Sequence, residues 1–256
     1  MRITRLPVAI AVAALLPLSA CGADDPSGID GDTTLTVLAA ASLTETFTTL
    51  ADRFEADHAG VTVELAFDSS ATLAQQAVDG APGDVLATAD EATMQTAVDG
   101  GAVTEGPEVF ATNVAVLVTP PDNPSGISDF AGLDDEAVTY VACVETAPCG
   151  KIAATLLDEA GITHQPASLE VDVKAVLAKV TSNEADAGIV YATDAAAQAE
   201  DVIAVEIPGA EEHPAVYPIA TLEQSEHPDL AREFWDLVLS DAGQQVLGDA
   251  GFRPSP

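Results

Sequence analysis

Positive charge is scarce in this chain. The 256 residues include 8 Lys and Arg against 42 Asp and Glu, which gives a formal net charge of −34 at pH 7. Such an acidic surface is typical of a highly soluble protein, and it repels DNA, RNA and anionic lipid headgroups, so we expect no nucleic-acid partner. It also repels anionic ligands at long range. A site for an anion would therefore have to use hydroxyl groups and oriented dipoles at short range.

The common catalytic and nucleotide-binding motifs are absent. The chain has no Gly-x-x-x-x-Gly-Lys, no Gly-x-Gly-x-x-Gly after a strand, no His-Glu-x-x-His and no Gly-x-Ser-x-Gly. The four histidines are scattered, at His58, His164, His213 and His227. A serine hydrolase using Ser42 or Ser70 would need one of them nearby. We keep that reading as an alternative and expect a binding protein without enzymatic activity or cofactor.

Long apolar runs are also missing, except at the N-terminus. Residues 6–20 form an apolar run that is too short for a comfortable transmembrane helix, and Arg2 and Arg5 precede it. We interpret residues 1–20 as a signal peptide. Residues 18–22 (Leu-Ser-Ala-Cys-Gly) resemble the bacterial lipoprotein box, in which Cys21 would receive the lipid; an ordinary signal peptide is the alternative.

The segment after Cys21 is too polar to fold. Residues 21–32 are rich in Asp, Gly, Pro and Ser, which predicts a flexible tether. The mature protein is therefore expected outside the cytoplasmic membrane, attached to it through the lipid alone.

Cysteine is the next scarce residue, with three in the chain. With Cys21 assigned to the lipid, Cys143 and Cys149 remain as an even pair in an oxidising compartment. Residues 146–148 (Thr-Ala-Pro) between them favour a chain reversal, so we expect a disulfide, with two free thiols as the alternative. No histidine or acidic cluster accompanies the pair, so we expect no site for a free metal cation.

What the chain does have is a regular alternation of strand and helix patterns. The expected strands are 34–40, 61–67, 84–88, 114–119, 138–142, 169–171, 187–191 and 215–222. The expected helices are 43–58, 72–79, 91–99, 151–160, 173–181, 230–239 and 242–250, with one more after residue 191. This order predicts an α/β fold with two doubly wound lobes around a ligand cleft. Residues 33–112 and about 196–256 would form the first lobe, and about 113–195 the second.

Several expected helices begin directly after a strand, with small or hydroxyl residues at the junction. These junctions contain Ser42, Ser69-Ser70, Pro148-Cys149-Gly150 and Asp172-Val173. Each helix N-terminus offers unpaired N–H groups and the positive end of a dipole, so a converging set could hold a small oxyanion. The local alternative is capping, because Ser42 and Glu45 match a capping box and Ser69 and Ser70 could be ordinary caps.

Seven segments, in their order, closely resemble the extracytoplasmic molybdate-binding proteins of ABC importers. They are residues 38–44, 69–76, 80–85, 89–90, 172–177, 183–191 and 217–220. The resemblance runs from about residue 34 to residue 252. It implies a Venus-flytrap fold of the type II periplasmic-binding-protein class with two hinge crossovers. It also implies a monomer that delivers molybdate or tungstate to an ABC permease and its cytoplasmic ATPase.

The resemblance further implies five residues around a tetrahedral dianion. Ser42 and Ser70 would donate hydroxyl and backbone N–H groups from the first lobe. Cys149 and Val173 would donate backbone N–H groups from the second, and Tyr191 its phenolic O–H.

Three residues depart from the family pattern or bring negative charge to the expected site. Cys149 stands where better-known members carry Ala, a change that a backbone donor tolerates. Asp68 replaces a small residue, and an acceptor carboxylate there would suit a protonated oxyanion such as hydrogen phosphate. Glu45 would also repel a fully ionised anion unless it points to solvent. Sulfate and phosphate therefore remain alternative ligands.

Overall fold

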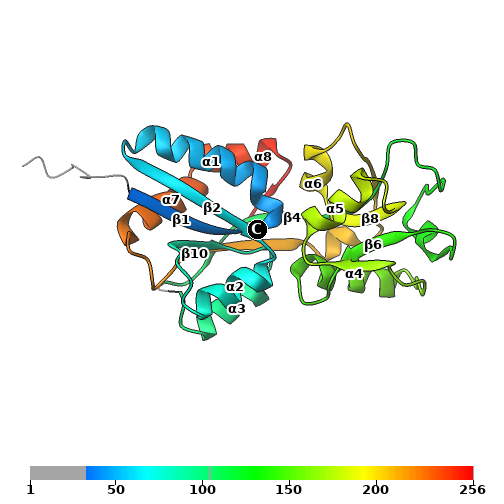
Figure 1. Ribbon diagram of the computed structural model, residues 1–256, viewed down its shortest axis with the longest axis horizontal. Coiled ribbons are helices and arrows are strands. Elements are labelled where there is room, and N and C mark those ends of the chain that lie inside the picture. The colour runs from blue at the N-terminus through cyan, green and yellow to red at the C-terminus, as the bar shows by residue number, and fades with distance from the viewer. Residues whose placement is uncertain (1–32, 104, 256) are drawn as a thin grey trace, which may run out of the picture.

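The protein consists of two α/β lobes that lie side by side, as the computed structural model in Figure 1 shows. The structure describes residues 33–103 and 105–255. The expected signal peptide, the lipid-bearing Cys21 and the tether all lie outside the described residues. No helix within the described ranges is long and apolar enough to cross a membrane.

The first lobe is built on a six-stranded sheet with the order β11-β4-β10-β3-β1-β2. Its strands are β1 (Thr33–Ala40), β2 (Val61–Asp68), β3 (Val85–Ala87), β4 (Glu108–Asn113), β10 (Ala215–Thr221) and β11 (Arg253–Pro254). Strand β1 pairs in parallel with β2 and β3, whereas β10 runs antiparallel to β3 and β4.

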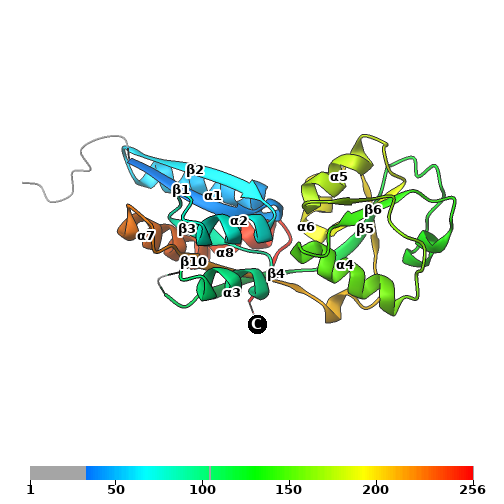
Figure 2. The ribbon, with the colours of Figure 1, turned by 60° about the horizontal axis from the view of Figure 1, so that its bottom comes forward.

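Helices cover both faces of this sheet (Figure 2). They are α1 (Thr44–Asp57), α2 (Ser70–Val78), α3 (Glu91–Asp99), α7 (Pro228–Leu239) and α8 (Asp241–Asp249). Helices α1, α7 and α8 share one core with the sheet, in which Phe47 and Phe54 pack edge-on against Phe234. Helices α2 and α3 form a separate core on the other face.

The second lobe has a five-stranded sheet with the order β7-β6-β8-β5-β9. Its elements are β5 (Ala115–Thr119), β6 (Tyr140–Cys143), α4 (Pro148–Glu159), β7 (Ser168–Glu170), α5 (Val173–Thr181), β8 (Ala187–Tyr191), α6 (Ala192–Ala197) and β9 (Ile203–Glu206). Short 3₁₀ helices occur at η1 (Ala41–Leu43), η2 (Phe130–Asp134) and η3 (Ala210–Glu212). Helix α4 begins at Pro148, earlier than expected, because a proline is well tolerated at the first position of a helix.

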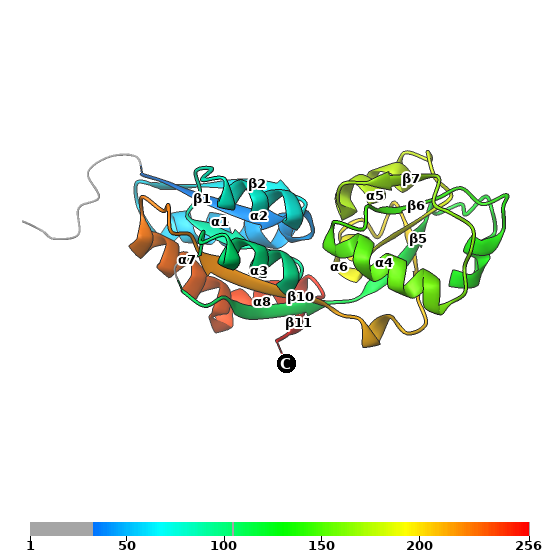
Figure 3. The same ribbon diagram turned by 90° about the horizontal axis from the view of Figure 1, so that it is seen from below.

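Two crossovers connect the lobes. The chain passes from β4 to β5 after Asn113, and it returns from β9 to β10, where Ala215 pairs with Asn113. The crossovers therefore lie next to each other, as Figure 3 shows for the ribbons of β4 and β10. The return comes later than the expected residue 196, because β9 still pairs with β5 of the second lobe. Strand β9 is largely exposed, and its apolar run at residues 202–205 (Val-Ile-Ala-Val) is too short to distinguish a strand from a helix segment by periodicity.

Candidate functional site

The expected strand-to-helix junctions meet at one small cavity between the lobes. Its lining comprises Ala40, Ala41, Ser42, Asp68, Ser69, Ser70 and Ala89 from the first lobe, and Ala147, Pro148, Cys149, Asp172, Val173 and Tyr191 from the second. All five residues predicted to bind the ligand are therefore on it. The cavity volume of about 20 Å³ suits a small inorganic ion, because sites for drug-sized organic molecules measure several hundred Å³.

Ser42 contributes a hydroxyl group to the cavity and does not cap its own helix. It lies in η1 and is buried, and its Oγ is 2.9 Å from the hydroxyl of Tyr217. The residue that caps α1 is Leu43, and the Glu45 carboxylate bonds Lys174 instead. The capping-box alternative for Ser42 and Glu45 is therefore wrong.

Ser70 is the first residue of α2 and is also buried. Its Oγ accepts the backbone N–H of Ala89 at 2.9 Å. Ser69 occupies the capping position of α2, but its side chain makes no capping hydrogen bond. Asp68 is half-buried at the cavity wall, where its Oδ1 accepts the N–H of Ser69 at 2.6 Å. A carboxylate thus lies at the edge of the site, as the sequence indicated.

The second lobe presents the N-termini of two helices to the cavity. Cys149 is the second residue of α4 and Val173 the first of α5, positions whose N–H groups have no acceptor within the helix. Asp172 caps α5 by accepting the N–H of Ala175 at 2.9 Å, which leaves the N–H of Val173 unused by the cap.

The predicted disulfide between Cys143 and Cys149 is confirmed, with the two Cα atoms 5.8 Å apart. It ties the end of β6 to the start of α4. The chain is so tight there that a Cβ atom on Gly150 would lie 1.9 Å from the carbonyl oxygen of Val144. Only glycine fits this position, so the cavity-facing turn of α4 is held by both a crosslink and a close backbone contact.

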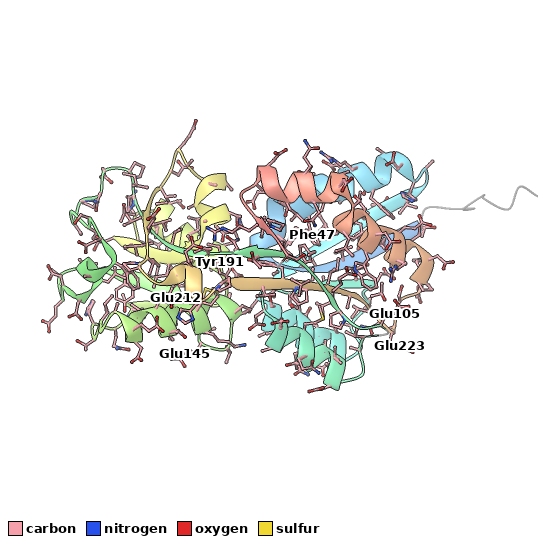
Figure 4. The ribbon with its side chains drawn as sticks, turned by 180° about the vertical axis from the view of Figure 1, so that it is seen from behind. Phe47, Glu105, Glu145, Tyr191, Glu212 and Glu223 are labelled. Carbon is pink, nitrogen blue, oxygen red and sulfur yellow. A yellow bond between two sulfur atoms is a disulfide. The ribbon has the colours of Figure 1, made fainter. Side chains whose placement is uncertain are left out.

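Tyr191 brings an unpaired hydroxyl group to the site. Its side chain is fully buried, and its Oη has no hydrogen-bond partner among the described residues. Burial raises the pKa of Tyr191 well above its usual value, so the phenol keeps its proton. Figure 4 places Tyr191 on the side of the second lobe that faces the first. A buried donor without an acceptor is unfavourable, so a ligand with acceptor oxygens would stabilise this group.

Two of the three lysines of the chain form ion pairs from the second lobe to the first. Lys174 Nζ lies 2.7 Å from Oε1 of Glu45, and Lys151 Nζ lies 2.7 Å from Oδ2 of Asp90. Neither lysine lines the cavity. The ion pair with Lys174 also offsets the negative charge of Glu45, which was expected to oppose anion binding unless its side chain pointed to solvent.

Lys174 makes a second ion pair within its own lobe, 3.1 Å from Oδ1 of Asp194. Burial raises the pKa of Asp194 to about 6, and the charge of Lys174 limits the rise. Burial alone would lower the pKa of Lys174, but Asp194 and Glu45 together raise it above the usual value. Sequence analysis missed this cluster, since nothing in the local pattern distinguishes these residues from a solvated helix face.

The described lining of this cavity gives a serine nucleophile no histidine to act as its base. The serine oxygens contact Tyr217 and the backbone N–H of Ala89. No group of three or more metal-binding side chains occurs in residues 33–103 and 105–255. The lining does not support the hydrolase alternative.

The comparison with known proteins identifies the family. Residues 35–253 match the family of bacterial extracellular solute-binding proteins. The chain belongs to this family. The molybdate-binding protein ModA of Mycobacterium tuberculosis is 39% identical over 97% of this chain and 96% of its own length. ModA of Escherichia coli is 31% identical over 85% and 88%, respectively.

Solved structures agree with the fold of this solute-binding protein. The periplasmic molybdate-binding protein of Azotobacter vinelandii aligns with a TM-score of 0.77 and 20% identity, covering 87% of this chain and all of its own. The sulfate-binding protein SubI of Mycobacterium tuberculosis aligns with a TM-score of 0.76 and 19% identity, covering 87% of each chain. At these identities the likeness concerns the fold alone. It confirms the expected two-lobed α/β class.

Proposed function

We propose that this solute-binding protein captures molybdate, and tungstate, outside the cytoplasmic membrane. The single observation that carries the proposal is the buried, unpaired hydroxyl of Tyr191 at a cavity lined by helix N-termini of both lobes. The 39% identity to a molybdate-binding protein over nearly the whole chain supports this choice among oxyanions.

The cavity would hold the anion with neutral donors. Hydroxyl groups of Ser42, Ser70 and Tyr191 would donate together with the backbone N–H groups of Cys149 and Val173. No lysine or arginine is present in the described lining, so helix dipoles and oriented hydrogen bonds would offset the ligand charge. Because the donors come from two lobes, binding would select the closed arrangement and opening would release the ligand.

The protein would act as a monomer that passes its ligand to an ABC permease driven by a cytoplasmic ATPase. A lipid on Cys21 would keep it at the membrane. The test is a Cys21→Ser variant in cells fed a labelled fatty acid. We expect loss of the label and release of the protein from the membrane fraction. Retention of both would contradict the lipid anchor without affecting the ligand assignment.

Hydrogen phosphate is a second candidate ligand, and one observation favours it. Asp68 lies at the cavity wall, where a carboxylate could accept the proton that phosphate keeps near neutral pH. Sulfate, which keeps no proton, would fit the same neutral donors as molybdate. Titration of the protein with each anion distinguishes these ligands.

Calorimetric titration of the domain with molybdate, tungstate, sulfate and phosphate tests the proposal. We expect submicromolar binding of the first two and much weaker binding of the others. Tyr191→Phe should weaken molybdate about 10- to 100-fold, as for a lost hydrogen bond to a charged group. Tyr140→Phe is the matched control, because that buried hydroxyl donates to the carbonyl of His164, away from the cavity. Tight binding of phosphate alone would overturn the molybdate assignment.

A further inference from the structure

The direction of the hydroxyl hydrogens at the cavity follows from the fixed partners of the serine oxygens. Ser70 Oγ accepts the backbone N–H of Ala89, a group that can only donate. The single hydrogen of Ser70 is therefore left for another acceptor, and Ser70 lines the cavity. The corresponding partner of Ser42 is Tyr217, whose hydroxyl could in principle donate or accept.

Burial decides which way this second contact runs. The Tyr217 hydroxyl lies 2.9 Å from Ser42 Oγ, and the Tyr217 side chain is completely buried. A buried hydroxyl group must place its hydrogen on an acceptor, because an unpaired donor in the interior costs free energy.

Among the described residues, the acceptor that lies within hydrogen-bond distance of the Tyr217 hydroxyl is Ser42 Oγ. Tyr217 is completely buried, and burial raises its pKa far above the usual value, so this hydrogen is never lost in the physiological range. A buried phenol that failed to donate would leave an unpaired donor, which is costly. Tyr217 therefore donates to Ser42 Oγ, and the hydrogen of Ser42 is free for the cavity.

We propose that Tyr217 is a positioning residue that turns the Ser42 hydroxyl into an obligatory donor and so favours fully deprotonated oxyanions. The inference rests on the proposed function, since it assumes that the cavity holds an oxyanion. With Ser42, Ser70 and Tyr191 all donating, the cavity matches a ligand whose oxygens are all acceptors. A ligand that carries its own hydrogen would have to place it on the Asp68 carboxylate at the cavity wall or direct it against one of these donors.

Tyr191 and Tyr217 would therefore have different roles at the site, although their ring centroids are only 6.2 Å apart. Tyr191 would touch the ligand, whereas Tyr217 would act on it only through Ser42. Removing the Tyr217 hydroxyl should free Ser42 to rotate and accept a hydrogen bond. Binding of molybdate should then weaken more than binding of hydrogen phosphate.

A double-mutant cycle with two anions tests this role. Tyr217→Phe should weaken molybdate about 10-fold in the otherwise wild-type protein, but less than about two-fold when Ser42 is already Ala, because the effect passes through Ser42. The ratio of molybdate to hydrogen phosphate affinity should fall about 10-fold. Tyr140→Phe, the control, should leave the ratio unchanged. A merely structural role would weaken both anions alike and in both backgrounds, which would overturn the inference.

A second variant keeps the test open if Tyr217→Phe fails to fold. Ser42→Ala removes the hydroxyl group that Tyr217 is inferred to direct, so molybdate should weaken more than hydrogen phosphate and the same ratio should fall. An unchanged ratio in a folded Ser42→Ala protein contradicts the inference. If the wild-type protein binds none of the anions, the proposed function fails and the inference fails with it. If molybdate binds tightly and the cycle is additive, the inference alone fails.

Discussion

The ammonium group of Lys151 on α4 lies 2.7 Å from Oδ2 of Asp90, the residue that caps α3 on the opposite lobe. Together with Lys174 and Glu45, this contact joins the two lobes across the cavity. An ion pair that exists only when the lobes are together stabilises the closed form, so it should slow ligand release more than it speeds ligand capture.

Lys151→Met should therefore raise the dissociation rate of molybdate about three- to five-fold, the effect of a partly exposed ion pair, with little change in the association rate. Stopped-flow release measurements give both rates. Lys179→Met is the matched control, because it removes the same charge from the same lobe but breaks the Lys179–Glu184 pair within that lobe. If both variants change the rates equally, overall charge is responsible and the interlobe contact is not.

Gly150 provides a sharper test of the geometry at the start of α4. A Cβ atom there would collide with the Val144 carbonyl oxygen, which is backbone and cannot move aside. Gly150→Ala should lower the free energy of unfolding by about 3 kcal/mol and weaken ligand binding, because the neighbouring Cys149 N–H would shift.

Gly248→Ala is the control for this substitution. Gly248 lies in α8 with open space around the added Cβ, so alanine should raise stability by about 0.5–1 kcal/mol. Denaturant unfolding measures both variants. A Gly150→Ala protein as stable as wild type would show that the turn before α4 is looser than described.

The contacts that join the lobes mark the limit of sequence-based prediction for this protein. Ser42, Ser70 and Val173 could be marked as candidate anion-binding positions because each follows a strand at a helix start, a local pattern, and the family resemblance then implied that they share one site. Lys174 and Glu45 are 129 residues apart, and Ser42 and Tyr217 are 175 apart, so no local pattern links them. Strand β9 is a different case, because residues 202–205 (Val-Ile-Ala-Val) do form a local apolar run, but one too short to distinguish a strand from a helix segment.

The Cys143–Cys149 disulfide closes a short loop, with a sequence separation of 6. In the chain-entropy account a crosslink of this span stabilises the fold by about 2 kcal/mol, and reduction should lower the free energy of unfolding by that amount. Ligand release should also become faster, because the N–H of Cys149 is then held less firmly. The control is the Cys143→Ser/Cys149→Ser protein, on which the reductant should have no effect. An effect of reductant on that protein would point to another cause.

Asp194 should give the protein a measurable pH dependence of stability. Its pKa in the folded protein is raised to about 6 from 3.8, first by burial, so folding favours the neutral carboxyl. The stabilising contribution of the neutral form is complete below pH ~4 and is lost as the pH rises through about 6. Over that range the wild type should lose up to about 3 kcal/mol relative to Asp194→Asn, which cannot ionise. Denaturant unfolding at several pH values measures the difference.

Lys174→Met tests the cause of this pH dependence. Because the charge of Lys174 lowers the pKa of Asp194, the variant should lose its stability at a higher pH than the wild type. A difference between wild type and Asp194→Asn that stays constant with pH would mean that the carboxyl does not change its protonation on unfolding.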